Sequence, residues 1–212
     1  MTAGLPSTFV RLAGCNLRCT WCDTRYTWDW AQFNPKQEIL TLDAEVVLRQ
    51  VEIQGPRNVV ITGGEPLLQQ SELANLASEL KRAGFRIEVE TNGTILPTAL
   101  SAMVDQWNVS PKLESSGNAL VEREVEGALD WFSRCPSAYF KFVVVQPDDV
   151  DAAMALAGRY SVPNDRVVLM PEGTDAFTLA ERSRWLIDRC CDLGVRYSTR
   201  LHILLWGPER GR

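Results

Sequence analysis

Three cysteines near the start of the sequence, Cys15, Cys19 and Cys22, are spaced closely enough to bind metal together. No fourth cysteine or histidine follows nearby. Structural zinc sites usually have four protein ligands, whereas a metal position left open is typical of catalysis. Three thiolates hold three irons of a four-iron cluster and leave the fourth iron free. The spacing therefore predicts a [4Fe-4S] cluster whose open iron binds a small molecule.

An open iron of this kind can chelate the amino and carboxylate groups of S-adenosylmethionine. An electron from the cluster then breaks the sulfonium bond and yields a 5′-deoxyadenosyl radical, which is chemistry that side chains alone do not supply. Two other interpretations stay open at this point. Zinc can use the three cysteines with a distant fourth ligand, for which His202 is the chain's only histidine, or the spacing is accidental.

The composition of the chain limits the classes of protein to which this site can belong. The chain has 212 residues and a net charge of −5, which argues against a broad nucleic-acid or anionic-membrane surface. No apolar run reaches the length of a membrane span, and no secretory signal is recognisable. We therefore expect a cytoplasmic protein with reduced thiols, in which Cys190 and Cys191 are packing residues and the role of Cys135 stays open.

Predicted strands and helices alternate along the chain. Apolar and β-branched runs predict strands at residues 7–14, 58–64, 85–93, 108–112, 139–145, 165–173 and 200–207. Helical spacing predicts helices at residues 42–53, 71–84, 97–107, 150–160 and 178–194. The capping signals are Ser71 for the second helix, Pro97 for the third, and Thr178 with Glu181 for the last.

This alternation predicts an α/β fold with a parallel sheet covered by helices. A doubly wound sheet and a (βα) barrel both fit the pattern, but a full eight-fold barrel typically needs about 250 residues. We expect a partial (βα)6-type barrel with parallel strands, forming a single domain over residues 1–212. In such folds the chemistry collects at the C-terminal ends of the strands, where the cysteine loop and most Gly- and Pro-containing loops fall.

Two motifs resemble the radical S-adenosylmethionine superfamily. CNLRCTWC matches its CxxxCxxC signature, with Trp21 before the third cysteine, and TGGEP at residues 62–66 matches its GGEP motif. The resemblance implies that Glu65 and the backbone of Gly63 and Gly64 contact the methionine amino group. Further cofactor contacts implied by the resemblance are Trp21, Asp23, Gly64, Ser110, Pro111 and Lys112.

The chain resembles more narrowly the 7-carboxy-7-deazaguanine synthase family. The segments that carry this resemblance are FVRLAGCNLRCTWCDT, VVITGGEPLLQ, VETNGT, SPK and LHILLWG. The resemblance implies ring contraction of 6-carboxy-5,6,7,8-tetrahydropterin to 7-carboxy-7-deazaguanine with loss of ammonia, in queuosine and 7-deazapurine biosynthesis. It also implies magnesium as a second metal, a homodimer, and an electron donor such as a flavodoxin.

Specific residues follow from this narrower resemblance. Thr24 resembles the family's magnesium ligand, and Arg11, Thr62 and His202 resemble its substrate contacts. Arg11 lies on the first predicted strand, where its planar fork can bind a carboxylate. His202 is expected on an inward-facing strand, although a histidine there is more often a core residue.

Other candidates are open between function and packing: Lys141, Glu90, Asn92, Glu172, Trp28 and Trp30. Relatives usually begin with a further strand and a Gly-Glu-Gly type loop that touches the substrate, which the start of this sequence lacks. We therefore expect substrate affinity to be the property most exposed to this difference.

Two other functions are compatible with the cysteines. One is a radical enzyme that activates a protein partner by installing a glycyl radical. The other is a non-enzymatic metal-binding module, stabilised by zinc or carrying electrons. The resemblance of LHILLWG and Thr24 favours the deazaguanine-forming reaction on a small pterin substrate.

Overall fold

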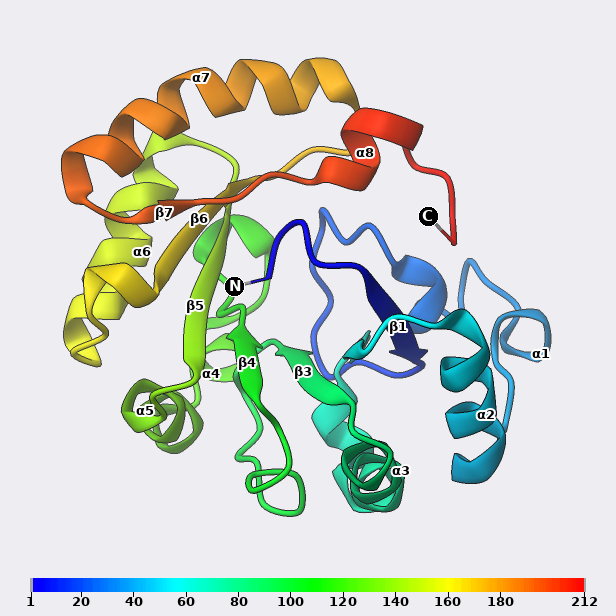
Figure 1. Ribbon diagram of the computed structural model, residues 1–212. Coiled ribbons are helices and arrows are strands. Elements are labelled where there is room, and N and C mark those ends of the chain that lie inside the picture. The colour runs from blue at the N-terminus through cyan, green and yellow to red at the C-terminus, as the bar shows by residue number, and fades with distance from the viewer. Residues whose placement is uncertain (1, 212) are drawn as a thin grey trace.

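The computed structural model describes residues 2–211 and contains one sheet of seven parallel strands. The strands pair in chain order: β1 Ser7–Leu12, β2 Asn58–Gly63, β3 Arg86–Thr91, β4 Gln106–Val109, β5 Ala138–Val144, β6 Val167–Pro171 and β7 Arg196–Tyr197. They form an arc with β1 and β7 at its edges, and helices α2, α3, α5, α6 and α7 lie outside it (Figure 1). The predicted partial barrel with parallel strands is confirmed.

Eight α-helices lie within the described part of the chain. Their bounds are α1 Pro35–Glu38, α2 Ala44–Gln54, α3 Gln70–Arg82, α4 Leu120–Arg123, α5 Glu126–Arg134, α6 Pro147–Arg159, α7 Ala176–Leu193 and α8 Leu201–Trp206. Four of the predicted helices correspond to α2, α3, α6 and α7. Over residues 2–211, every helix is too short or too polar to cross a membrane.

The outward-facing side chains of the strands form the core with the helices. Register neighbours such as Ile61, Val89 and Trp107 are fully buried, and α3 packs Leu76 and Leu80 against this side. The sheet therefore has a conventional apolar outer face, which explains why its strands are recognisable in the sequence.

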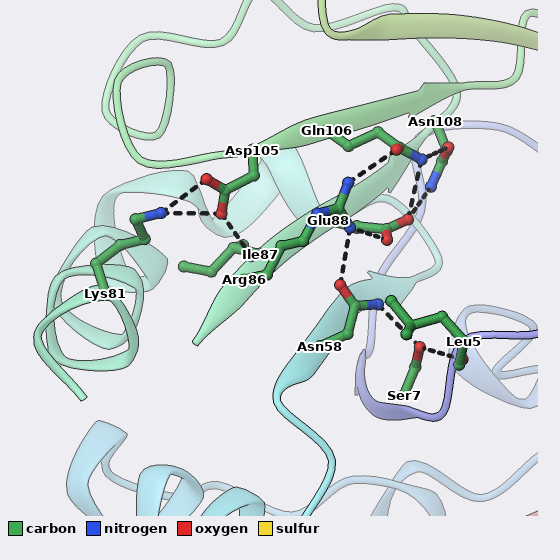
Figure 2. A network of polar contacts seen from close by, with 10 residues as sticks. All are labelled: Leu5, Ser7, Asn58, Lys81, Arg86, Ile87, Glu88, Asp105, Gln106 and Asn108. Carbon is green, nitrogen blue, oxygen red and sulfur yellow. Dashed lines mark hydrogen bonds and ion pairs between the residues drawn. The ribbon is translucent and has the colours of Figure 1, made fainter. Parts of the chain in front are cut away.

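The inner face of the arc is polar toward the N-terminal ends of the strands (Figure 2). Glu88 is 1% exposed and forms an ion pair with Arg86. Its carboxylate also accepts hydrogen bonds from Gln106 Nε2 at 3.1 Å and Asn108 Nδ2 at 3.0 Å. Arg86 in turn donates to Asn58 Oδ1 at 2.8 Å. These bonds link β2, β3 and β4 through the barrel interior.

The helix predicted at residues 97–107 is wrong. The segment is a series of turns that ends at β4. The side chain of Gln70 on α3 accepts hydrogen bonds from the backbone of Thr98 at 2.7 Å and Ala99 at 3.3 Å. Asp105 accepts from Ile87 N at 2.8 Å on the neighbouring strand. Tertiary hydrogen bonds thus replace the intrahelical ones.

The strand predicted at residues 200–207 is also wrong. Only Arg196 and Tyr197 pair with β6, and the chain then turns into helix α8. Of α8's side chains only Ile203 is buried, so the apolar run reflects a surface helix rather than a buried strand.

Two capping predictions are wrong as well. Helix α3 begins after Gln69 rather than Ser71, and α7 is capped by Asp175, which accepts from Thr178 N at 2.8 Å. The short helices α4 and α5 were not predicted.

We predict that Arg86→Met lowers the free energy of unfolding by about 2–4 kcal/mol, because it leaves the buried Glu88 carboxylate without its cation. This loss is smaller than for a fully buried ion pair, because the Arg86 side chain is itself 35% exposed. Urea denaturation measures it. The matched control is Arg82→Met, which breaks an exposed ion pair with Glu79 and should cost less than about 1 kcal/mol. Equal losses in the two variants would contradict the structural role of the interior pair.

Candidate functional site

The cysteine loop follows β1 and is held by the loops after other strands. Gly14 N donates to Thr27 O at 2.6 Å, which closes the base of the loop. Asn16 binds the β3 loop through Thr94 Oγ1 at 2.8 Å. Thr20 N donates to Ser116 O at 3.0 Å, beyond β4. The loop is therefore fixed from three directions.

Each of the three cysteine sulfurs accepts one N–H donor. Leu17 N lies 3.4 Å from Cys15 Sγ, Asn118 Nδ2 lies 3.3 Å from Cys19 Sγ, and Trp28 Nε1 lies 3.3 Å from Cys22 Sγ. Such donors are typical of thiolates that ligate iron–sulfur clusters.

The three thiols are chemically suited to bind iron, one thiolate to each of three irons of a cluster. Burial raises the pKa of both Cys15 and Cys19, so they become thiolates when a metal displaces their protons. Within residues 2–211, no three His, Cys, Asp or Glu side chains converge as ligands of one metal ion.

The GGEP loop lies directly against the cysteine loop. A Cβ on Gly64 would lie 2.1 Å from Gly14 O and 2.9 Å from Cys15 Cβ, so a side chain cannot be accommodated there. Gly64 N donates to Leu12 O at 3.0 Å, and Glu65 N donates to Gly14 O at 2.8 Å. Glycine is thus required by the close approach of two backbones.

Glu65 is completely buried between these loops. Its carboxylate accepts three hydrogen bonds, from Leu67 N at 3.0 Å, Thr91 Oγ1 at 2.8 Å and Asn92 N at 2.6 Å. Burial raises the pKa of Glu65, while these donors act in the opposite direction. The side chain therefore joins the loop after β2 to the loop after β3.

The residues proposed to contact the cofactor surround the cysteine loop. Lys112 Nζ donates to Ser110 O at 2.6 Å and Ser110 Oγ at 2.9 Å, and it lies 5.9 Å from the centre of the Trp21 ring. Trp21 Nε1 donates to Ser115 O at 3.0 Å. Burial lowers the pKa of Lys112, and the nearby Cys19 and Cys15 raise it. Pro111 lies between the two polar residues.

A second polar layer lies at the C-terminal end of the inner face. Arg11 on β1 pairs in register with Thr62 on β2. Thr62 Oγ1 donates to Glu90 Oε2 at 3.0 Å, and Lys141 Nζ lies 2.7 Å from Glu90 Oε1. The Lys141 charge, with smaller help from Arg11, lowers the pKa of Glu90 to about 2. Glu90 is therefore a carboxylate at neutral pH, and the charge of Arg11 is close enough to contribute to that shift.

The C-terminal segment reaches the same site. Arg200 is 8% exposed, pairs with Asp23 at 2.9 Å and donates to Gly173 O at 3.2 Å. His202 follows on α8, where partial burial and the Arg200 charge lower its pKa, with Asp23 acting oppositely. The strand predicted for His202 is wrong, but the side chain still lies within the electrostatic reach of the site.

Thr24 lies beside the cluster ligands, with its Oγ1 3.6 Å from Cys22 Sγ.

The candidates left open between function and packing have different surroundings. Asn92 Nδ2 donates to Asn16 Oδ1 at 2.8 Å, so it anchors the cysteine loop. Glu172 forms an ion pair with Arg182 on α7. Trp30 is 39% exposed.

The remaining cysteines lie away from this site as free thiols. Cys190 is buried in the core, and burial raises its pKa to about 11. Cys135 packs against the core, and Cys191 is exposed. A groove of about 1000 Å³ lined by Glu124, Glu126 and Arg159 is formed by other elements and contains none of the predicted site residues.

Three residues of the site were not predicted: Asn118, Arg200 and Asn16. Each acts through a long-range hydrogen bond to a segment distant in sequence. Asn16 lies inside the CNLRC motif, which was the one signal available. Asn118 lies in a segment that carries no motif or periodicity, and Arg200 directly precedes the LHILLWG segment without being part of it.

Comparisons with known proteins agree with this geometry. The family model described as Radical SAM superfamily matches residues 10–177. A 7-carboxy-7-deazaguanine synthase from Pyrobaculum aerophilum is 39% identical, over 99% of this chain and 90% of the relative. One from Halobacterium salinarum is 34% identical, over 98% of this chain and 86% of the relative.

Solved structures give the same result. The crystal structure of QueE from Escherichia coli superposes with a TM-score of 0.67 at 28% identity, covering 93% of this chain and 86% of that chain. Streptococcus suis SuiB, at 13% identity and a TM-score of 0.65, shares the fold. The chain belongs to the 7-carboxy-7-deazaguanine synthase family of the radical S-adenosylmethionine superfamily.

Proposed function

We propose that this protein converts 6-carboxy-5,6,7,8-tetrahydropterin to 7-carboxy-7-deazaguanine with loss of ammonia, as a single catalytic domain. The observation that carries the proposal is the charged layer formed by Arg11, Thr62, Glu90 and Lys141. It lies at the strand ends next to the GGEP loop. A cationic fork beside a fixed carboxylate suits a substrate that carries both a carboxylate and ring N–H donors.

The bound cluster and S-adenosylmethionine supply the radical that starts the reaction. The chain's own residues bind and orient the reactants. Cys15, Cys19 and Cys22 hold the cluster, and the backbone of Gly64 with the Ser110–Lys112 segment forms the cofactor side of the site. Asp23 and Trp21 border it.

On the substrate side, Arg11 binds the pterin carboxylate, and Thr62 and His202 contact the ring system. Glu90 stays ionised because the positive charge of Lys141 lowers its pKa. Its carboxylate therefore accepts hydrogen bonds without taking up a proton. Asp23 is fixed by Arg200, which keeps its carboxylate oriented beside Thr24.

Thr24 is proposed as a magnesium ligand. A hydroxyl is a weak ligand on its own, so water and the substrate carboxylate would complete the shell. Hard, well-hydrated Mg²⁺ accepts such a shell. The position of Thr24 beside Cys22 supports the placement of this ion between cluster and substrate.

The biological setting is proposed from the family. It comprises a cytoplasmic homodimer, reduction by a flavodoxin-like donor, and a role in queuosine and other 7-deazapurine biosynthesis. The net charge of −5 is consistent with a small-molecule substrate rather than a nucleic acid.

The direct test is anaerobic incubation of the reconstituted protein with S-adenosylmethionine, dithionite and the carboxypterin, followed by mass spectrometry. We expect the 7-deazapurine acid, with magnesium raising the rate. No product from a fully loaded cluster would overturn the proposal. Cofactor cleavage only in the presence of a protein partner would favour an activating enzyme, and zinc without iron or sulfide would favour a binding module.

We predict that Arg11→Met lowers kcat/KM for the pterin by about 10–100-fold, since a hydrogen bond to a charged group contributes about 1.5–3 kcal/mol. The effect should appear mainly as a higher KM in steady-state assays. Arg49→Met on α2, which removes a helix-surface charge, is the matched control. An unchanged KM in Arg11→Met would remove this residue from the substrate site.

We predict that Lys141→Met changes the pH dependence of stability. In the wild type the pKa of Glu90 is depressed to about 2, so its stabilising effect is complete above its ordinary pKa of 4.5 and is lost as pH falls toward 2. Without the Lys141 charge, burial is the largest remaining influence on this pKa and acts to raise it, against smaller opposing effects of Thr62 and Arg11. The variant should then lose stability, relative to wild type, as pH rises from 4 to 8 in urea titrations. Parallel curves for both proteins would show that the pair is not coupled.

A further inference from the structure

The donors to two of the cysteine sulfurs are side chains rather than backbone. Asn118 Nδ2 lies 3.3 Å from Cys19 Sγ, and Trp28 Nε1 lies 3.3 Å from Cys22 Sγ. The third donor is the backbone N–H of Leu17. Side chains can be exchanged between proteins of one fold, so these two positions can vary the environment of the cluster without changing its ligands.

The orientation of the Asn118 amide is fixed by a second bond. Its Oδ1 accepts from Arg18 N at 2.7 Å, and a carbonyl oxygen is the only atom of the amide able to accept there. The NH₂ group is therefore directed to Cys19 Sγ and Ser116 Oγ, the latter at 3.0 Å. Asn118 is 9% exposed and Cys19 is 7% exposed, so water does not compete strongly for this sulfur.

Trp28 is held in a comparable way. The Arg18 guanidinium lies 4.7 Å from the centre of its ring, and Arg18 Nη1 donates to Cys15 O at 2.6 Å. Arg18 thus contacts Trp28 with its side chain and Asn118 with its backbone. Both N–H groups are anchored by the same residue of the cysteine loop.

The electrostatic consequence concerns the cluster's redox equilibrium. Reduction adds one electron from an external low-potential donor and leaves the thiolate bonds in place. The positive end of an N–H dipole stabilises the more negative, reduced state, and it does so strongly where water is excluded.

We infer that Asn118 and Trp28 set the reduction potential of the iron–sulfur cluster by donating N–H groups to Cys19 and Cys22. They are positioning residues for electron uptake, because they act through the ligand sulfurs of Cys19 and Cys22. The inference rests on cluster binding and is independent of the pterin reaction proposed above.

The test is an EPR-monitored redox titration of the reconstituted protein without S-adenosylmethionine or substrate, after iron and sulfide analysis. Trp28→Phe removes one N–H and keeps an aromatic ring against Arg18. Asn118→Leu removes the other donor and keeps the same branched side-chain shape. Trp30→Phe is the matched control, because the exposed Trp30 indole makes no described bond to a cysteine sulfur.

We expect the midpoint potential to become more negative in Trp28→Phe and in Asn118→Leu, and more negative again in the double variant. Trp30→Phe should match the wild type. Unchanged potentials in both loaded variants would overturn the inference. A failed pterin assay with shifted potentials would instead count against the proposed reaction alone.

A second measurement needs no substitution. Wild-type protein labelled with ¹⁵N-indole tryptophan should show a ¹⁵N hyperfine coupling to the reduced cluster in pulsed EPR, because Trp28 Nε1 contacts a ligand sulfur. Absence of that coupling in a loaded, reduced sample would contradict the Trp28 contact even if the variants fail to bind a cluster.

Discussion

The buried carboxylate of Glu65 is the contact on which the site's assembly depends. Burying an acid without partners is costly, and truncating one member of a buried network leaves the others unsatisfied. Here three donors from two loops converge on a side chain with no exposed surface. Its backbone N–H, bound to Gly14 O, adds the cysteine loop. One residue therefore fixes the relative positions of three strand-end loops that are separate in the sequence.

The sheet that carries these loops departs from the usual parallel sheet, which is apolar on both faces. Its outer face is apolar, but its inner face carries two polar layers. The Arg86–Glu88 pair lies toward the N-terminal ends of the strands, and the Glu90–Lys141 pair lies toward their C-terminal ends. Each layer pairs one anion with one cation and so limits the cost of burying charge. Arg11 lies outside these pairs, which leaves a positive charge at the end of the barrel where an anionic substrate group is proposed to bind.

The sequence predicted the cysteine loop, the GGEP loop and most strands, because these depend on local signals such as motif spacing and β-branched runs. It failed at residues 97–107, where a distant side chain decides the conformation, and at residues 200–207, where the strand ends early. Hydrogen bonds to the Gln70 side chain hold residues 98–99 in turns. Strand β7 ends at Tyr197, so residues 200–207 lie beyond the sheet. The polar inner layers were partly visible as Glu90 and Lys141, but Glu88 and Asn118 carry no local signal, because their roles depend on partners up to 99 residues away.

The open edge of the barrel gives Arg200 its significance. Among the described residues β7 pairs only with β6, and β1 only with β2, so backbone hydrogen bonds do not join the two ends of the arc. Arg200 makes that link with its side chain, binding Gly173 O after β6 and Asp23 in the loop after β1. A fork with several donors suits such a bridge. Because α8 starts immediately afterwards, the same residue also delivers His202 to the site. Side-chain bonds therefore provide here what strand pairing provides in a closed barrel.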